Sequence, residues 1–284
     1  MSFSPAMEDG RPITIRRPRA HSWKPGGKVR ELAQYGDLFR TLTEHRIRVR
    51  YKQSILGLGW AILQPLSMML IFTLVFGRIA RMQTDGVPYA LFAFSGLLLW
   101  SFISTSVNNS TQALVGHAQL ITKVYFPREV LPLSYVAAAL FDLLVGSIVL
   151  LGILAWYGQP ISLHLLFALP VIATAAMLTT AIAFALSTLQ VRFRDIGIAV
   201  PLLLYLWMFS TPIAYPLSAV PARYRAIFEL NPLTGIIEGF RDVVLRHHAP
   251  SPTLLAVPLL TAAVLLPIAY ALFKRAEATM ADVI

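Results

Sequence analysis

The sequence predicts an all-α integral membrane protein with six transmembrane helices in each subunit. Of its 284 residues, 56% are hydrophobic and 13% are charged, whereas soluble domains carry about 25% charged residues. Long apolar stretches recur along the chain, and a helix needs about 20 such residues to cross a bilayer. We expect spans at residues 57–77, 88–113, 131–157, 164–190, 197–215 and 253–273.

The distribution of Lys and Arg predicts that both termini lie in the cytoplasm. Twelve of the 24 Lys and Arg precede the first expected span, and six more lie at 123–128, 192–194 and 274–275. Loops rich in these residues stay on the cytoplasmic side of a membrane. The net charge of +10 is therefore a membrane-surface feature, and we expect no binding to nucleic acid. The six cations on the other side are Arg78, Arg81, Arg223, Arg225, Arg241 and Arg246.

The chain divides into four segments. Residues 1–28, where Pro and Gly alternate with Arg, are expected to form a flexible basic cytoplasmic tail. Residues 29–52 are expected to form an amphipathic helix in the membrane interface, or a small cytosolic helix packed on a partner, and the two are compatible. The six-span domain covers 53–275, and 276–284 form a cytoplasmic C-terminal end. The apolar stripe of the amphipathic helix is Leu32, Tyr35, Phe39 and Leu42.

A basic segment becomes apolar abruptly where the first span is expected to begin. A helix that leaves a charged membrane surface and enters hydrocarbon needs this change, because each cation beside anionic headgroups contributes about 1 kcal/mol. The indole of Trp60 suits the boundary, and neighbouring helices can satisfy the carbonyl that Pro65 frees. The expected membrane-surface anchor is Arg46, Arg48, Arg50, Lys52 and Trp60.

The segment 216–252 is expected to form a helical hairpin that dips back between spans five and six. Pro221–Glu229 and Pro232–Leu245 have helical patterns, and Asn231 before Pro232 is an N-cap followed by a first-turn proline. Irregular backbone at that depth must be buried in protein or line a cavity. The apolar stripe of the second helix is Leu233, Ile236, Ile237, Phe240 and Val244.

The sequence carries no motif for catalysis. There is no Cys, which excludes disulfides and thiolate chemistry, and there is no ATP-binding glycine loop, metal-ligand cluster or plausible Ser-His-Asp set. We therefore expect no catalytic residue, no metal and no cofactor in this chain. Asp142 lies inside the third expected span, where an ionisable residue is functional by default. No second acid or base accompanies it, so a carboxyl hydrogen-bonded to a neighbouring helix is the alternative that we favour.

Four stretches of the chain carry a family resemblance. They are RVRYKQSILGLGWAILQPL (48–66), LITKVYFPREVLP (120–132), VRFRDI (191–196) and NPLTGIIEGFR (231–241). Together they resemble, in the same order, the type-2 ABC transporter permeases that export polysaccharides, which are the membrane subunits for O-antigen, capsule and teichoic acid. The resemblance covers residues 30–275 and does not reach the tail.

The resemblance implies a homodimer with a channel along its axis in a bacterial cytoplasmic (inner) membrane. It also implies two copies of a separate ABC ATPase subunit, which bind ATP and Mg²⁺. On this basis we expect the chain to be the channel-forming subunit of an exporter for a lipid-linked polysaccharide such as O-antigen, surrounded by membrane lipids. Two alternatives stay open: a type-2 exporter of a small hydrophobic drug or lipid, and an integral membrane glycosyltransferase of the same pathway.

The loop at 114–130 is expected to contact the ATPase. Its close-set apolar residues and flanking cations are typical of an inter-subunit anchor, and by resemblance it is the coupling helix, with a second, smaller contact at 192–195. A helix resting in the headgroups is the alternative. The expected coupling residues are Leu120, Lys123, Val124, Tyr125, Phe126, Pro127, Arg128, Arg192, Arg194 and Asp195.

Aromatic side chains and the hairpin complete the expected transport path. Sugars present C–H faces that stack on rings, so aromatic pairs one turn apart on the first and fifth spans are candidates for the channel wall. The periplasmic hairpin is expected to act as an exit gate. The channel candidates are Phe72, Phe76, Tyr205 and Phe209, and the gate candidates are Pro221, Asn231, Pro232, Phe240 and Arg241.

Overall fold

A computed structural model describes residues 7–8, 11–12, 35–52, 56–57, 59–160 and 162–283. The chain forms two units, residues 1–34 and 35–284. In the first unit the two-residue strands β1 (Met7–Glu8) and β2 (Arg11–Pro12) pair antiparallel. Most of the predicted tail over 1–28, and the first six residues of the predicted helix over 29–52, lie outside the described residues.

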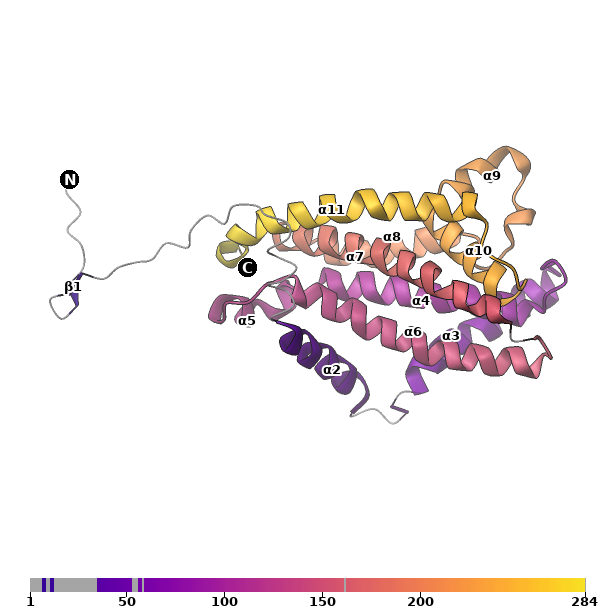
Figure 1. Cartoon of the computed structure of the whole chain (residues 1–284), viewed down its shortest axis with the longest axis horizontal. Helices are drawn as coiled ribbons and strands as arrows, with labels where there is room; N and C mark the ends of the chain where they lie inside the picture. Colours follow the sequence, from indigo (N-terminus) through magenta and orange to yellow (C-terminus); the bar gives the residue numbers. More distant parts are fainter. Residues whose placement is uncertain are drawn as a thin grey trace. The chain divides into compact units, whose positions relative to one another are not determined.

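The second unit is helical throughout its described residues. Helices α4, α6, α7 and α11 lie alongside one another, with α5 and the C-terminus at one end and α9 and α10 at the other (Figure 1). We call these the α5 end and the α9 end. The long helices are α2 (Gly36–Lys52), α3 (Gly59–Phe72), α4 (Tyr89–Thr111), α6 (Val130–Trp156), α7 (Ala168–Arg192), α8 (Ile196–Phe209), α10 (Pro232–Val244) and α11 (Pro252–Val283). The short ones are η1 (Thr73–Ile79), η2 (Val115–His117), α5 (Ala118–Lys123), η3 (Leu163–Phe167), η4 (Leu217–Ala219) and α9 (Ala222–Glu229).

Among the described residues, five helical stretches are long and apolar enough to cross a membrane. They are Gly59–Ile79, Tyr89–Thr111, Val130–Trp156, Leu163–Arg192 and Pro252–Met280. Each matches one of the six expected spans, so the chain is a multi-pass membrane protein.

The expected fifth span, 197–215, is shorter in the structure. Helix α8 ends at Phe209, and its 14 residues rise about 21 Å, less than the ~30 Å hydrocarbon core of a bilayer. Pro212 explains the early end, because the residue before a proline avoids helical angles. The chain then turns from Ser210 to Tyr215 and forms η4 before reaching α9. A membrane crossing by residues 197–215, which would bring the total to six, stays a prediction.

Helix α4 forms the centre of the unit. It is buried along most of its length and contacts α3, α6, α7, α8 and α10. Helices α3 and α11 have most of their side chains at the surface of the subunit. A lipid- or partner-facing surface on these outer helices explains why their sequences are apolar around the whole helix.

The two helices of the predicted hairpin are present. Their observed bounds, Ala222–Glu229 and Pro232–Val244, agree with the sequence pattern. The Asn231 side chain accepts a hydrogen bond from the Leu233 amide, and Pro232 occupies the first turn, as an N-cap requires. The apolar stripe of α10 is buried against α4, α7 and α11. Re-entry of the hairpin into a membrane stays a prediction.

Close packing between α10 and α11 depends on Gly235. A Cβ at this position would lie 2.9 Å from Pro258 Cδ and would collide with the backbone carbonyl of Leu254. A backbone atom cannot rotate away as a side chain can, so α10 must shift if Gly235 gains a methyl group.

We predict that Gly235→Ala lowers the free energy of unfolding by about 1–3 kcal/mol, as overpacked cores do. Equilibrium unfolding of the purified permease in detergent micelles measures the change. Gly152 of α6 provides the control, because an added Cβ there meets nothing within 4 Å. Equal stability of the Gly235→Ala and Gly152→Ala variants would show that α10 and α11 do not pack this closely.

Candidate functional site

The predicted coupling loop divides into an exposed part and a buried part. Helix α5 ends at Lys123, and Val124 is extended. Tyr125 is 85% exposed, whereas Phe126 is 4% exposed and packs in a core cluster with Phe184 and Phe273. Phe126 therefore stabilises this subunit, in contrast to our prediction that it contacts a partner. Leu120 is half-buried, Pro127 is buried, and Lys123 and Val124 are exposed.

Ion pairs fix the end of this loop to α11. The amide of Arg128 donates to Glu277 Oε1 at 3.1 Å, and its guanidinium donates to the Glu277 carbonyl. Lys274 Nζ lies 2.6 Å from Glu129 Oε2 and 2.8 Å from Glu277 Oε2. We expected Arg128 to pair with acidic groups on a partner, but it binds the C-terminal helix of its own chain. The predicted cytoplasmic end 276–284 continues that helix to Val283.

The second predicted contact, at 192–195, lies next to the start of the coupling loop. Arg192, Arg194 and Asp195 are exposed. The connection between α7 and α8 is held by Gln190 Nε2, which donates to the Arg194 carbonyl at 3.2 Å. Gly197 lies against the side chain of Gln112, the residue that follows α4. The two predicted contacts can therefore form one surface at the α5 end.

Two residues of the predicted membrane-surface anchor, Arg46 and Arg50, contact helix α6 of the same subunit. The Arg46 guanidinium stacks on the Tyr135 ring with its Cζ 3.4 Å from the ring centroid, and its Nε donates to Ser134 Oγ at 2.7 Å. Arg50 forms an ion pair with Asp142. These contacts join α2 to α6. Arg50 is also exposed, and contact of the two arginines with headgroups stays a prediction. Arg48 and Lys52 are exposed, as is half of the Trp60 side chain.

Asp142 has two partners on α2. Besides Arg50, the Tyr51 hydroxyl donates to Asp142 Oδ1 at 2.5 Å. Burial and this hydrogen bond raise the pKa of Tyr51 to about 12, so the phenol keeps its proton near neutral pH. The carboxyl is thus hydrogen-bonded to a neighbouring helix, the alternative that the sequence favoured.

A buried arginine organises the α9 end. The Arg241 side chain is fully buried and stacks on Phe92, with Cζ 3.5 Å from the ring centroid. Its Nη1 and Nη2 donate to the carbonyls of Pro212 at 2.6 Å, Ile213 at 2.7 Å and Phe92 at 3.1 Å. Glu238 Oε1, 2.8 Å away, supplies the opposite charge. Arg241 therefore binds α4, α10 and the turn after α8 together, and Phe240, also buried, packs beside it.

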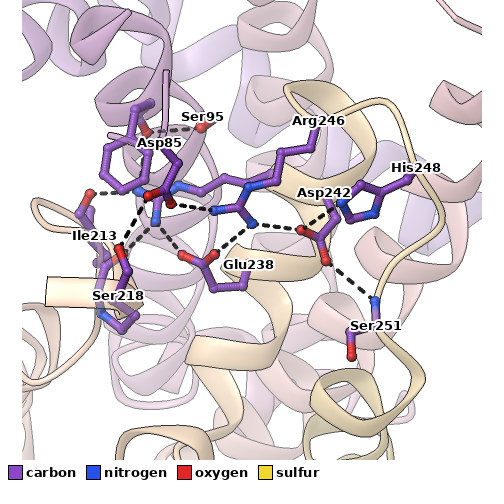
Figure 2. Close-up of polar contacts among 12 residues, drawn as sticks. Asp85, Ser95, Ile213, Ser218, Glu238, Asp242, Arg246, His248 and Ser251 are labelled. Atoms are coloured by element: carbon purple, nitrogen blue, oxygen red, sulfur yellow. Dashed lines mark hydrogen bonds and ion pairs between the residues drawn. The ribbon is translucent and has the colours of Figure 1, made fainter. Parts of the chain in front are cut away.

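Arg246 extends this cluster toward solvent (Figure 2). It lies 3.1 Å from Glu238, 2.7 Å from Asp242 and 3.5 Å from Asp85 in the connection between η1 and α4. Burial lowers the pKa of Arg246, but the hydrogen bond to Asp242 and the charge of Glu238 outweigh burial, and the pKa is raised. Sequence reasoning missed this cluster. The detectable signal was the spacing of Glu238, Arg241 and Asp242, which repeats charges along an otherwise apolar helix.

The candidate channel aromatics have different environments. Phe72 is 6% exposed and meets Phe76 edge-on at 5.5 Å between ring centroids, so Phe72 belongs to the core of the subunit and is not on an open wall. Tyr205 and Phe209 on α8 are each about three-fifths exposed. The gate candidates Pro221, Asn231 and Pro232 cap α9 and α10, and Trp207 Nε1 donates to Asn231 Oδ1 at 3.0 Å.

These features define a helical, multi-pass membrane protein. Its helices α3, α8 and α11 expose large apolar side chains, and its loops at the α5 end expose polar ones. The family model for the membrane domain of ABC-2 type transporters matches residues 37–245. The chain belongs to this family.

Two curated relatives match over nearly their whole length, and a third matches over 81% of its length and 74% of this chain. The O-antigen export system permease protein RfbA of Myxococcus xanthus is 32% identical over 256 residues, which cover 89% of this chain and 98% of the relative. A protein of the same name from Klebsiella pneumoniae is 30% identical over 249 residues, or 87% of this chain and 95% of the relative. A further Klebsiella pneumoniae relative of that name is 29% identical over 211 residues.

We predict that Lys274→Met lowers the free energy of unfolding by about 3–5 kcal/mol, because the buried Glu129 carboxylate would lose its cation. The double variant Lys274→Met/Glu129→Gln should recover much of that loss. Equilibrium unfolding in detergent micelles measures both. Arg275→Met, at an exposed neighbouring position, should change stability by less than about 0.5 kcal/mol. Additive effects of the two substitutions would contradict the pairing.

Proposed function

We propose that this chain is the channel-forming subunit of an ATP-driven exporter that moves a lipid-linked, O-antigen-like polysaccharide across a bacterial cytoplasmic membrane. The observation that carries the proposal is the 32% identity to a permease named for O-antigen export, over 98% of that protein. The chain itself catalyses no reaction in this scheme. Nucleotide binding by a separate subunit shifts the equilibrium between a closed and an open channel.

The proposed channel forms between two copies of the chain. Large apolar side chains on α3, η1 and α8 are exposed in the single subunit, among them Leu70, Leu74, Leu203 and Leu206. An apolar surface of this kind can face lipid or a second subunit. Because Tyr205 and Phe209 share the exposed surface of α8, a homodimer that joins α3 and α8 would bring their rings next to the path of the sugar chain.

The proposed motor is a pair of ABC ATPase subunits, which hold the ATP and Mg²⁺. Their contact surface on this chain would be Lys123, Val124 and Tyr125, with Arg192, Arg194 and Asp195 beside them. All six are exposed at the α5 end. An exposed tyrosine rimmed by charges is the composition that interface anchors share. The hydrogen bonds of Arg128 and the ion pairs of Lys274 hold the loop that presents it.

The proposed orientation puts both termini and the α5 end in the cytoplasm, and the α9 end in the periplasm. Its support is the count of Lys and Arg along the sequence: twelve precede the first span and six lie at 123–128, 192–194 and 274–275, against six in the remaining segments. Single cysteines at the exposed positions 123 and 223 test it, because the chain has no Cys of its own. We expect an impermeant thiol reagent to label intact spheroplasts at 223 and to leave 123 unlabelled. The reverse pattern would overturn the orientation.

Deletion of the gene tests the function. We expect surface polysaccharide to disappear and lipid-linked glycan to accumulate inside the cell, and we expect the wild-type gene to restore export. Normal surface polysaccharide in the deletion strain would contradict the proposal and favour a drug or lipid as the cargo.

The adjacent residues Tyr125 and Phe126 should separate coupling from folding. Because Tyr125 is exposed, we predict that Tyr125→Ala costs about 2–4 kcal/mol of ATPase binding and leaves the stability of the permease unchanged. Because Phe126 is buried, Phe126→Ala should cost about 3–5 kcal/mol of unfolding free energy. Co-purification of the ATPase and unfolding in detergent measure the two effects. A Tyr125→Ala protein with normal ATPase binding and normal export would remove this loop from the coupling surface.

A further inference from the structure

A cavity of about 270 Å³ lies between the end of α2 and helices α3, α4 and α6. It is separate from the exposed surface of α8. Its lining includes apolar side chains, among them Leu98, Phe102 and Leu143, and a group of polar side chains, which we call the polar wall. Polar side chains inside membrane helices are costly and mark functional sites by default. We therefore expect the cavity to bind a ligand that forms hydrogen bonds with its polar wall.

The polar wall is a regular feature of α4. Ser101, Thr105 and Asn109 are spaced by four residues, so they lie on one face of the helix, and all three line the cavity. They are half-buried, whereas Phe102, Ile103, Ser106 and Val107 between them are buried. Opposite them, Gln64 of α3 adds a further amide. The cavity thus presents two hydroxyls and two amides, which can donate and accept hydrogen bonds.

These four side chains keep their hydrogen-bonding capacity for a ligand. Within the described residues, no hydrogen bond joins the side-chain polar atoms of Gln64, Ser101, Thr105 or Asn109 to another protein group. Other hydroxyls near the same end of α4 are satisfied internally. Ser110 Oγ donates to the Pro132 carbonyl at 3.1 Å, and Thr111 Oγ1 donates to the Val107 carbonyl at 2.7 Å. The contrast separates the hydroxyls that bind protein from those that face the cavity.

The charges of the cavity cancel. Arg50 and Asp142 both line it and form an ion pair with one another, and the Tyr51 hydroxyl donates a hydrogen bond to the same carboxylate. A site for a phosphate or carboxylate would need cations that are not paired with a carboxylate, or several N–H donors directed at the same position. A wall of hydroxyls and amides around a neutralised ion pair instead matches a neutral ligand with many hydroxyl groups.

An aromatic ring lies on the rim of the cavity. Trp60 lines it and is 52% exposed, so one part of the indole is open to a ligand. Sugar rings combine apolar C–H faces with a rim of hydroxyls. The indole can stack on the C–H faces, and the amides and hydroxyls of the cavity can form hydrogen bonds with the sugar hydroxyls. The volume is slightly below the ~300–1,000 Å³ range of small-molecule pockets, which gives room for a single sugar ring and not for an oligosaccharide.

We propose that this cavity binds one neutral sugar unit of the exported glycan, at a site beside the channel. The proposal rests on the proposed function, because it takes the cargo to be a glycan. The sugar hydroxyls are bound by the polar wall, which consists of Gln64, Ser101, Thr105 and Asn109. Trp60 stacks on the sugar ring, and the Arg50–Asp142 ion pair holds the end of α2 against the cavity.

Site-specific photo-crosslinking in cells that make the glycan tests the site. The photoreactive amino acid p-benzoylphenylalanine replaces Gln64 on the rim of the cavity, and in a matched strain it replaces Ile148, an exposed residue of α6 outside the cavity. The purified permease is then analysed by mass spectrometry, with and without periodate, which cleaves vicinal diols. We expect a periodate-sensitive sugar adduct at 64 and none at 148. An adduct at 64 that contains only phospholipid, or no adduct in a strain that exports normally, would overturn the proposal.

Isosteric variants measure the contribution of the polar wall. Thr105→Val removes a hydroxyl that faces the cavity, and we expect the initial rate of export to fall about tenfold, the effect of losing one hydrogen bond of about 1.4 kcal/mol. Ser104→Ala is the control, because Ser104 does not line the cavity and its hydroxyl donates to the Ser101 carbonyl of its own helix. Equal export rates in the two variants would overturn the proposal.

The outcomes distinguish this site from the function itself. If deletion of the gene leaves surface polysaccharide unchanged, the proposed function fails, and the sugar site fails with it. If export depends on the gene but the adduct at position 64 carries no sugar, only the sugar site fails.

Discussion

The structure depends on the rule that a polar group removed from water must find its partners inside the protein. Arg241 shows what this rule demands, because a fully buried guanidinium must be given one carboxylate and several acceptors. Three backbone carbonyls and Glu238 supply them for the two terminal nitrogens, and Nε is left without a partner among the described residues. Gly96 makes the arrangement possible, since a Cβ there would lie 2.7 Å from Arg241 Nη2. The charge that is costly to bury thereby fixes the start of α4, the turn after α8 and helix α10 in one arrangement.

The same rule accounts for the two ends of the helical unit. At the α9 end, Arg246 shares Glu238 with Arg241 and reaches Asp242 and Asp85. At the α5 end, Lys274 serves both Glu129 and Glu277. Between them α4 packs in a large cluster of buried apolar side chains, although its Ser95, Ser106, Ser110 and Thr111 are buried as well. Dispersion forces pack the middle with little directional preference, and the polar clusters at both ends determine which loop meets which helix.

The sequence predicted the parts of this fold that local chemistry determines. Five spans, the helix ending at Lys52 and both helices of the hairpin follow from hydropathy, helical spacing and the Asn231–Pro232 cap. The sequence did not predict which side chains far apart in the chain contact one another. The partners of Arg46 and Arg50 lie 88 and 92 residues away. A run of cations in the sequence has the same pattern whether its side chains face lipid headgroups or a neighbouring helix. Tyr125 and Phe126 were inseparable for a related reason: successive side chains of an extended segment point to opposite sides, and only the fold determines which side is buried. The length of the fifth helix could have been corrected from Pro212 alone.

Helix α11 has contacts at both ends that give it a mechanical property. Near its start, Leu254 and Pro258 touch Gly235 of α10, and near its end Lys274 and Glu277 hold the loop that carries Tyr125. Its 32 residues rise about 48 Å. Pro258 and Pro267 lie inside the helix, and each removes one backbone hydrogen bond, so α11 can bend at these two points. A displacement of that loop that leaves the ion pairs intact must therefore move or bend α11, and a moving α11 pushes on α10 at the α9 end. A force applied at the α5 end of this subunit can therefore be transmitted to the α9 end through helix α11.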